Sequence, residues 1–221
     1  MTVSTSPTTP DRSASGAKSH VAATSVDARK LPSYRNHIVS LGATNETIRD
    51  FWNPASLRIR ALERVFGRFP PFVAARAVTL GLRASGVKIG RATVFWGMPE
   101  LVGSGDVCSR LSVGTYCGFN ARCYFELADK ITISDHVAVG QDVMFLTRTH
   151  DTSNPMKRAG KMASAPIEVG NGAWIGARCT IMPGVKIGAG AVIGASVVVA
   201  KDVPANMLLM GNRSISLAKW R

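Results

Sequence analysis

Apolar residues recur at every sixth position through the second half of the chain, and this period constrains the fold more than any other feature. The large members of the series are Ile89, Phe95, Leu101, Val107, Val113, Phe119 and Phe125, then, after a two-residue slip, Ile133, Val139 and Phe145, and, after an interruption, Val169, Ile175, Ile181, Ile187, Ile193 and Val199. The chain is 46% hydrophobic, so apolar residues would fill all of these positions by chance with a probability of only ~0.46 to the sixteenth power. A short fixed period of this kind indicates internal repeats.

A second series of small or β-branched residues lies four positions after most of the large ones. Its members are Cys117, Cys123, Val137, Val143, Ala173, Cys179, Val185, Ala191, Val197 and Val203. Glycine often follows the large residue directly, at Gly90, Gly114, Gly140, Gly170, Gly176, Gly188 and Gly194. We expect these glycines to let the backbone turn between faces without a Cβ penalty. Each six-residue unit thus has one large and one small inward position.

Short strands with this pattern cannot bury their apolar faces alone, whereas stacked coils lay like residues over one another and form a continuous core. An α-helix is excluded, because a six-residue period drifts around a helix by more than half a turn in each repeat. A sandwich of hairpins is excluded, because the chain lacks a two-residue alternation bounded by turns. The sequence therefore predicts an all-β fold of stacked parallel coils.

The most specific stretch of the repeats runs from Pro166 to Pro204 and reads PIEVGNGAWIGARCTIMPGVKIGAGAVIGASVVVAKDVP. Through its AWIGA, PGV-IG and KDVP elements, the chain resembles the hexapeptide-repeat transferases, and among them the galactoside, maltose and colanic acid O-acetyltransferase group. The resemblance covers about residues 87–205. It implies a left-handed parallel β-helix that assembles as a homotrimer of three-sided prisms, with active sites in the clefts between subunits. Acetyl-CoA would lie along the coils, and no metal is implied.

The repeat is interrupted after Phe145 by a long polar loop, residues 146–168. Loops that project from a regular scaffold often carry function. His150 opens this loop in a T-H-D setting that resembles the family's catalytic histidine, and imidazole titrates near neutrality, so it can act as a general base on a hydroxyl. A surface histidine beside a loop is the alternative. Asp151 is the nearest candidate to orient the imidazole.

Asn120 precedes His150 by thirty residues, a spacing that resembles that of an acceptor-contacting asparagine in the galactoside acetyltransferase group. The resemblance implies that its amide holds the acceptor hydroxyl or the developing oxyanion. The alternative is an asparagine at a coil corner that bonds to its own backbone, because asparagine suits turns for local reasons.

The resemblance also implies a binding site for acetyl-CoA. Trp174 matches a tryptophan beside the pantetheine arm, and Ala177 and Ala195 match small residues whose backbone meets it. Ala200 and Lys201 stand where the family has a Thr-Lys pair, and the lysine would reach a phosphate of the cofactor. The alternatives are ordinary packing for Trp174 and a solvated surface charge for Lys201.

The first part of the chain differs in character from the repeats. Residues 1–30 are rich in Ser, Thr and Ala and are predicted to form a disordered tail, while residues 31–86 are predicted to form a helical appendage and residues 206–221 a C-terminal tail. Within the appendage we expect a helix that starts at Pro54 and ends at Pro70-Pro71. Its apolar stripe is Leu57, Ala61, Leu62, Val65, Phe66 and Phe69, with Arg60, Arg64 and Arg68 on another face. A second apolar stretch, Phe72 to Leu82, is interrupted only by Arg76 and a few small or polar residues. It is predicted either to form a helical cap whose apolar stripe packs on the main domain or to lie as a helix on an anionic membrane.

Charge and cysteine content limit the remaining options. Lys and Arg outnumber Asp and Glu by 27 to 14, which favours polyanionic partners such as nucleic acid, an anionic membrane or a phosphorylated cofactor. The chain has no apolar run of about 18 residues and no apolar core of a secretion signal, so we expect no membrane span, no classical export signal and a cytoplasmic location. The four cysteines form no C-x-x-C pair, which favours buried thiols over a zinc or redox site.

The sequence therefore predicts an O-acyltransferase that moves an acetyl group from acetyl-CoA to a hydroxyl of a saccharide or glycolipid, with no nucleic acid partner. An acyl carrier protein is an alternative donor. Two other functions compete with this prediction. A γ-type carbonic anhydrase needs three histidines around zinc, and only His136 and His150 lie in the repeats. A non-catalytic trimeric scaffold or membrane-surface module is the second, because a fold does not guarantee chemistry.

Overall fold

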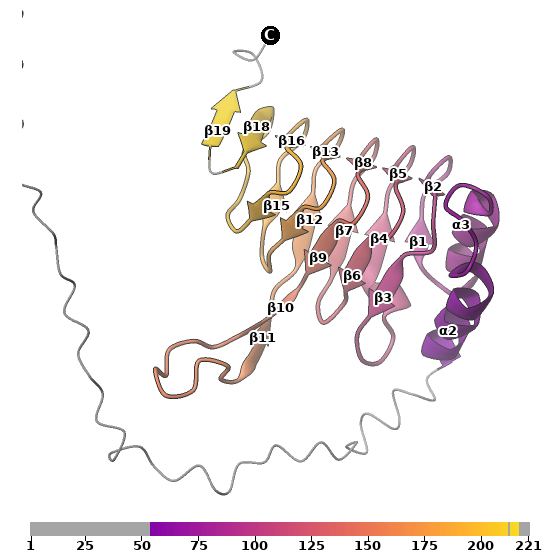
Figure 1. The fold of residues 1–221 in the computed structure, drawn as a ribbon, viewed down its shortest axis with the longest axis horizontal. Helices are drawn as coiled ribbons and strands as arrows, with labels where there is room; N and C mark the ends of the chain where they lie inside the picture. The colour runs from indigo at the N-terminus through magenta and orange to yellow at the C-terminus, as the bar shows by residue number, and fades with distance from the viewer. Residues whose placement is uncertain (1–53, 212, 217–221) are drawn as a thin grey trace, which may run out of the picture. The chain divides into compact units, whose positions relative to one another are not determined.

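The computed structural model describes residues 54–211 and 213–216, and their main body is a parallel β-helix with three sheets (Figure 1). The first sheet contains β1 (Lys88–Ile89), β4 (Leu111–Val113), β7 (Ile131–Ile133), β12 (Ile167–Val169) and β15 (Lys186–Ile187). The second contains β2 (Val94–Phe95), β5 (Gly118–Phe119), β8 (Ala138–Val139), β13 (Trp174–Ile175), β16 (Val192–Ile193) and β18 (Met207–Met210), with β19 (Arg213–Ser216) antiparallel at its edge. The third contains β3 (Glu100–Val102), β6 (Tyr124–Glu126), β9 (Met144–Leu146), β14 (Thr180–Ile181) and β17 (Val198–Val199).

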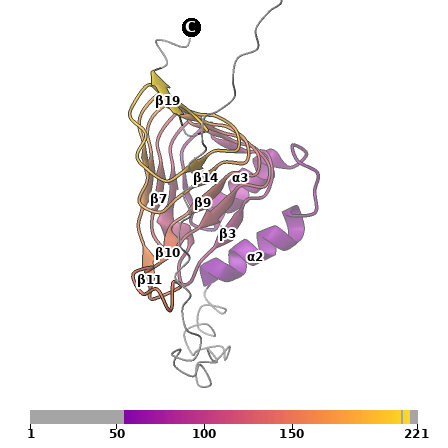
Figure 2. The same ribbon diagram turned by 60° about the vertical axis from the view of Figure 1, so that its left-hand side comes forward.

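The strand register places like residues over like, as the six-residue period requires. Val113 pairs with Ile89 on one side and with Ile133 on the other, and Ile133 in turn pairs with Val169. Every large residue of the predicted series is buried except Ile89, which is partly buried against the same core. The predicted β-helix of hexapeptide repeats is confirmed, and Figure 2 shows successive coils lying over one another.

Aromatic rings fill the first coils of this core. Phe95 and Phe119 stack with ring centroids 4.4 Å apart and planes 6° apart, and Phe125 and Phe145 stack at 4.9 Å. Close, nearly parallel rings repeat along the stack because each phenylalanine occupies the same inward position in successive coils.

The small inward positions are buried as well, and three of them hold cysteines, Cys117, Cys123 and Cys179. Cys108, Cys117, Cys123 and Cys179 are all buried and unpaired with one another. Burial raises the pKa of the Cys123 thiol to about 12 and that of Cys108 to about 11. The prediction that these cysteines act as small buried residues is confirmed.

The glycines that follow the large residues have a different role from the one expected. None of the seven adopts a positive φ. A Cβ at Gly140 would lie 2.5 Å from the backbone nitrogen of Ala177, and a Cβ at Gly170 would lie 2.6 Å from that of Ala189. The expectation that they ease the turn is therefore wrong: they allow adjacent coils to approach closely. The left-handed corner conformation is instead taken by other residues, including Arg122 at φ 59°.

Two helices lie at the β1–β2 end of the coil stack (Figures 1 and 2). In α3 (Ala75–Ala84), Val78 and Leu82 join the core. Arg83 donates hydrogen bonds to the carbonyl oxygens of Ile89 and Gly90, at 3.2 and 2.5 Å. The helix thereby covers the open edge of the first coil, as terminal caps of solenoids do. The cap interpretation is supported by these contacts.

The other helix, α2 (Pro54–Phe66), starts and ends close to the predicted positions, but only part of its predicted apolar stripe packs against the core. Ile59 is buried, and Leu62 and Phe66 are partly buried against the core. Leu57 and Val65 of the predicted stripe are exposed, at 41% and 56%. The helix has apolar residues on two faces, and periodicity alone did not identify the inner one. Among the described residues, no helix is long and apolar enough to cross a membrane.

The predicted loop contains a β-hairpin, and the predicted C-terminal tail contains two strands. Strands β10 (Arg148–His150) and β11 (Met162–Ser164) pair antiparallel and project from the coil stack between β9 and β12 (Figure 1). Strand β18 pairs in parallel with β16, so the described solenoid continues beyond residue 205. The tail predicted for residues 1–30 lies outside the described residues.

Candidate active site

The second sheet carries a long groove on its outer surface. Its floor is made of small residues from successive coils, Gly118, Ala138, Gly176 and Gly194. Trp96 and Trp174 rise from it, with 38% and 54% of their surfaces exposed. Small floor residues leave room for a ligand between large apolar side chains, which is the usual character of a small-molecule site.

Four of the residues predicted from the sequence line this one groove. They are Asn120, Trp174, Ala177 and Ala195, which come from three coils of the second sheet and its corners, those of β5, β13 and β16. They lie together because each stands one or two residues from the large inward residue of its coil, and stacking aligns these inward residues in successive coils. The other two cofactor candidates, Ala200 and Lys201, line a separate depression with Leu209 and Gly211, after β17.

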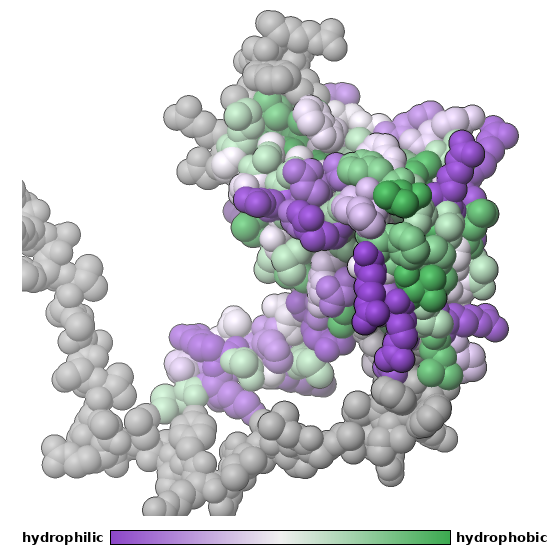
Figure 3. Space-filling view, turned by 45° about the vertical axis from the view of Figure 1, so that its right-hand side comes forward, coloured by the Kyte–Doolittle hydropathy of each residue, from purple (hydrophilic) through white to green (hydrophobic). Residues whose placement is uncertain are grey.

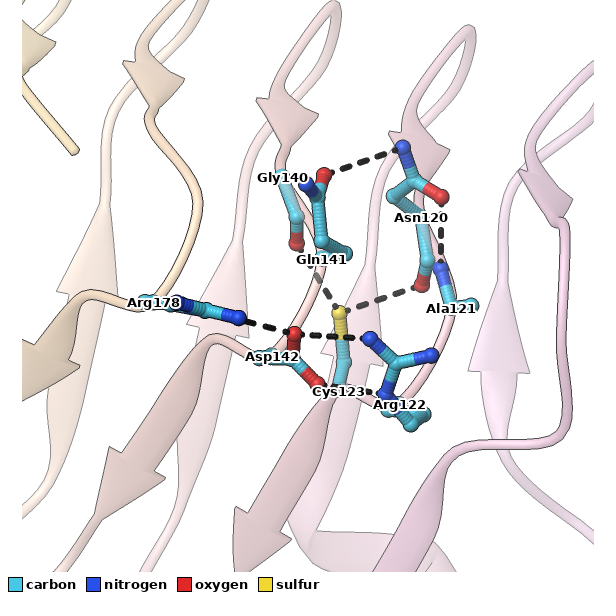
Figure 4. A network of polar contacts seen from close by, with 8 residues as sticks. All are labelled: Asn120, Ala121, Arg122, Cys123, Gly140, Gln141, Asp142 and Arg178. Carbon is cyan, nitrogen blue, oxygen red and sulfur yellow. Dashed lines mark hydrogen bonds and ion pairs between the residues drawn. The ribbon is translucent and has the colours of Figure 1, made fainter. Parts of the chain in front are cut away.

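Asn120 lies at the groove rim and already has a local partner. Its Oδ1 accepts a hydrogen bond from the backbone N–H of Ala121 at 2.8 Å, and its Nδ2 donates to Gln141 Oε1 over a long 3.4 Å (Figure 4). The thiol of Cys123 donates to the Asn120 carbonyl at 3.3 Å. The alternative of a corner asparagine bonded to its own backbone is therefore realised, while the Nδ2 donor is only weakly engaged.

A row of charged side chains borders the same corner. Arg122 makes a bidentate contact with Asp142 at 2.6 and 2.8 Å, and Arg178 lies 3.9 Å from the same carboxylate (Figure 4). The hydrogen bond from Arg122 holds the pKa of Asp142 below its usual range. Two arginines flank one aspartate, so this corner of the groove has a net positive charge, which suits a ligand that carries negative charge.

The hairpin that carries His150 is anchored at its base by Thr147, a fully buried residue. The Thr147 hydroxyl donates to the carbonyl oxygen of Glu126 at 2.6 Å and accepts from the N–H groups of Ala128 and Asp129 at 3.0 and 3.1 Å. The Arg148 N–H donates to the Glu126 carboxylate at 3.1 Å. These contacts fix the direction in which β10 leaves the coil.

His150 itself is exposed, and its Nδ1 lies 3.0 Å from the carbonyl oxygen of Gly160. A carbonyl oxygen can only accept, so Nδ1 is the donor in this contact, which leaves Nε2 as the nitrogen with the free lone pair in a neutral imidazole. Asp151 was expected to orient the ring, but its carboxylate instead accepts from the N–H and the hydroxyl of Ser153, at 2.9 and 3.0 Å. These bonds lower the pKa of Asp151.

Within one chain, His150 and the groove belong to different sides of the coil. The hairpin follows β9 of the third sheet, whereas the groove residues Asn120 and Trp174 lie on the second sheet and its corner. His136, the other histidine of the repeats, stacks on Tyr116 at a further corner, with ring centroids 5.1 Å apart. Among the described residues, no three His, Cys, Asp or Glu side chains are grouped to hold a metal ion.

Sequence reasoning missed three residues of this region. Gly160 was not identified, because its role comes from its carbonyl and the sequence carries no signal for that. Gln141 and Trp96 also line the groove and were missed; Trp96 directly follows the inward Phe95, whereas Gln141 lies at the corner after β8. An outward tryptophan beside Phe95 was the available signal for Trp96.

Residues 166–201 match the family described as bacterial transferase hexapeptide (six repeats). The galactoside O-acetyltransferase of Escherichia coli (strain K12) is 40% identical over 96 residues, which cover 43% of this chain and 46% of the relative. A putative acetyltransferase of Schizosaccharomyces pombe is 37% identical over 100 residues, 45% of this chain and 48% of the relative. The chain thus spans about half the length of the curated relatives it matches.

Solved structures agree on the fold. A hexapeptide-repeat acetyltransferase of Vibrio cholerae complexed with acetyl coenzyme A superposes with a TM-score of 0.63 at 24% identity, covering 80% of this chain and 90% of that one. A galactoside acetyltransferase in complex with coenzyme A gives 0.60 at 26%, covering 73% and 78%. A maltose O-acetyltransferase from Clostridium difficile gives 0.57 at 27%, covering 72% and 83%.

Proposed function

We propose that this chain, which carries the repeats of the bacterial hexapeptide transferase family, transfers an acetyl group from acetyl-CoA to a hydroxyl of a saccharide or glycolipid. The observation that carries the proposal is the groove that gathers Asn120, Trp174, Ala177 and Ala195 on one face. Relatives named galactoside O-acetyltransferase and maltose O-acetyltransferase, and neighbours solved with coenzyme A, support the same chemistry.

The groove fits an acyl-CoA arm in shape and polarity. A pantetheine chain is narrow and largely apolar, and a floor of glycines and alanines lets it approach the backbone of successive coils. Trp174 would flank the arm with its flat ring, and Ala177 and Ala195 would leave room beside it. Lys201 lies past β17 and would meet the phosphates of the cofactor as a point charge.

The separation of His150 from the groove within one chain leads us to propose a homotrimer in which each active site uses two subunits. The projecting hairpin of one subunit would bring His150 to the groove of its neighbour, where Asn120 lies. This assembly is testable by complementation. His150→Ala and Asn120→Ala chains are each expected to be inactive alone, and co-expression of the two is expected to restore part of the activity. Failure to restore any activity, with mixed trimers demonstrated, would contradict a shared site.

The reaction would then follow from the groups at that cleft. His150 Nε2 takes the proton of the acceptor hydroxyl as its oxygen attacks the thioester carbonyl, and the Gly160 carbonyl stabilises the imidazolium that forms. The Asn120 Nδ2 donates to the oxyanion. When the tetrahedral intermediate collapses, the C–S bond breaks, and the thiolate of CoA takes the proton back from His150. No acyl-enzyme intermediate is needed.

The test of the proposal is release of the CoA thiol from acetyl-CoA across a panel of sugars. We expect His150→Ala to lower kcat by about 10²–10⁴, the usual contribution of a general base. His136→Ala is the matched control, because His136 is also exposed and lies in the repeats but at another corner. Equal rates for wild type and His150→Ala would refute the base assignment. A stable trimer with no turnover on any acceptor would favour the scaffold function instead.

A peripheral contact with an anionic membrane is a second proposal, carried by the outward face of α2. Leu57 and Val65 are exposed there, and Arg58, Arg64 and Arg68 are exposed on the same helix and just after it. Figure 3 shows hydrophobic and strongly hydrophilic residues side by side at this end of the protein. Residues 54–84 hold six arginines and one glutamate, so a second copy of the face would repel it, whereas anionic lipid would complement it.

Cosedimentation with lipid vesicles tests this contact. Binding is expected to vesicles that contain phosphatidylglycerol and not to pure phosphatidylcholine, and it should fall when Leu57 and Val65 are both changed to Gln. Equal behaviour toward both vesicle types would refute the contact. A change in oligomeric state of the double variant would instead indicate that a second copy covers the face.

A further inference from the structure

We propose that helix α2 is a releasable cap, that Glu63 latches it to the open edge of the third sheet, and that the latch holds more tightly in acid than at neutral pH. Strand β3 is the first strand of that sheet, so one of its edges has no neighbouring strand. An open strand edge leaves backbone N–H and C=O groups without partners, and proteins cover such edges. Here α2 and α3 supply a different side chain to the open edge of each of the three sheets.

The first and second sheets are closed by side chains of α3 that keep their charge near neutrality. The N–H groups on either side of Phe95 donate to β5, so the Phe95 N–H points to the open edge of β2. There it donates to the Thr79 hydroxyl at 3.0 Å. Arg83 donates to carbonyl oxygens at the end of β1. Neither a hydroxyl nor a guanidinium titrates between about pH 5 and 8.

The third sheet is closed by a carboxylate of α2. The Glu100 N–H donates to the Cys123 carbonyl oxygen, so the alternation of a parallel ladder directs the Leu101 N–H to the open edge of β3. There the Leu101 N–H interacts with the carboxylate of Glu63. Ile59, one turn earlier on α2, is buried in the core. Glu63 and Ile59 therefore carry a polar and an apolar contact between α2 and the coil.

Helix α2 lies beside β3 in both ribbon views (Figures 1 and 2), but the space between them is not filled. A depression of about 440 Å³ lies there, lined by residues of α2, of β3 and of the loop that follows β3. Ile59 is the only buried side chain among those described in α2, whereas α3 buries Val78, Thr79 and Leu82. Segments with few buried contacts open locally before the rest of a protein. We therefore expect α2 to lift from the coil while α3 stays in place.

The charges around Glu63 make this latch sensitive to pH. Burial and the neighbouring Glu100 carboxylate raise the pKa of Glu63, and the opposing effects of Arg60 and the β3 backbone offset the rise only in part. Arg64 and Arg68 lie with Arg60 and Glu63 along the depression on the solvent side of the helix. These four side chains, together with Glu100, are the charged groups that line the two depressions beside Glu63.

The direction of the effect follows from the raised pKa. With α2 lifted, Glu63 ionises near its ordinary pKa of 4.5, and with α2 docked it ionises at a higher pH. Docking is therefore most stable below the ordinary pKa, loses stability as the pH rises through the docked pKa, and stays weaker above it. Acid tightens the latch, and neutral pH favours release, which uncovers Ile59 and the edge of β3.

Hydrogen exchange of the full chain, corrected for the intrinsic effect of pH on exchange, tests the latch between about pH 5 and 8. In the wild type we expect protection of α2 and of the Leu101 N–H to fall as the pH rises, while protection of α3 stays constant. Glu63→Gln keeps an acceptor for the Leu101 N–H but removes the charge, so protection of α2 at pH 8 should exceed that of the wild type, and its pH dependence should vanish. Glu63→Ala removes the acceptor as well, so protection should be low at every pH.

Two further variants separate the latch from a general effect of charge. Glu100→Gln removes the repulsive neighbour and should shrink the fall in protection. Glu168→Gln is the matched control, because Glu168 pairs with Lys186 at 3.2 Å on the first sheet, and it should behave as the wild type. Protection of α2 that is independent of pH in the wild type, or an undiminished fall in Glu63→Gln, would overturn the latch. A parallel fall in α3 would show that both helices open together and would overturn the assignment to α2.

Discussion

Two glycines in one corner of the solenoid, Gly170 and Gly172, provide a direct test of why the repeats contain glycine. Gly170 has no positive φ, and a Cβ there would lie 2.6 Å from the backbone nitrogen of Ala189 and 2.9 Å from the carbonyl carbon of Gly188. Gly172 has φ +67°, and a Cβ there would meet nothing within 4 Å. The first position is limited by the neighbouring coil, and the second only by backbone conformation.

The geometry gives different magnitudes for the two positions. Gly170→Ala forces two coils apart, at a cost of about 1–3 kcal/mol for overpacking. It also strains the 2.8 Å hydrogen bond from Gly170 N–H to the Ile187 carbonyl, worth about 0.5–1.5 kcal/mol. We expect a total of about 1.5–4.5 kcal/mol. Gly172→Ala should cost about 1–2 kcal/mol, the penalty for a Cβ in the left-handed region.

Asparagine separates the two causes, because it tolerates the left-handed conformation better than alanine but is larger. At position 172, Asn should be less destabilising than Ala, whereas at position 170, Asn should be at least as destabilising as Ala. Urea unfolding of the four variants, followed by tryptophan fluorescence at one fixed protein concentration, measures the order. If Asn were less destabilising than Ala at position 170, as it is expected to be at position 172, the close-approach argument would be refuted.

Further predictions concern the core, the thiols and the hairpin. Phe119→Ala should lower the free energy of unfolding by about 3–5 kcal/mol, because removal of its buried ring leaves a cavity. Phe69→Ala, at an exposed site, should lower it by less than about 1 kcal/mol. Similar losses of unfolding free energy in the two variants would contradict the assigned burial. Because burial raises the pKa of Cys123 to about 12, its thiolate forms only far above neutrality, so a thiol reagent at pH 8 should modify the chain's cysteines only after unfolding. Rapid labelling of the native protein would count against that. Gly160→Ala would place a Cβ 2.6 Å from the Asp151 carbonyl oxygen. It should lower kcat and change the pH profile of kcat through His150, while the melting temperature changes little. An unchanged pH profile would argue against an orienting contact between the Gly160 carbonyl and His150.

The fold was accessible from sequence because a solenoid repeats one local rule. Phe119 and Ile175 are inward because of their places in a six-residue unit, and neighbouring coils reinforce that choice. Asn120 and Trp174 stand beside these two inward residues, but it was the family resemblance, and not the repeat, that singled them out. The α2 helix was harder, because Leu57 and Ile59 are both apolar and only packing on the first coil selects Ile59.

The sequence alone therefore determined the stacked coils, their core and the polar loop that carries His150, since these depend on the order of side chains along the chain. Tertiary structure decided that Gly160, ten residues away, faces His150 and that Asp151 turns to Ser153. It also decided that the ring of Phe72 meets that of Trp96. Such contacts depend on the path of a hairpin or a helix connection in space, and a one-dimensional period reports which way a side chain points but not what it meets.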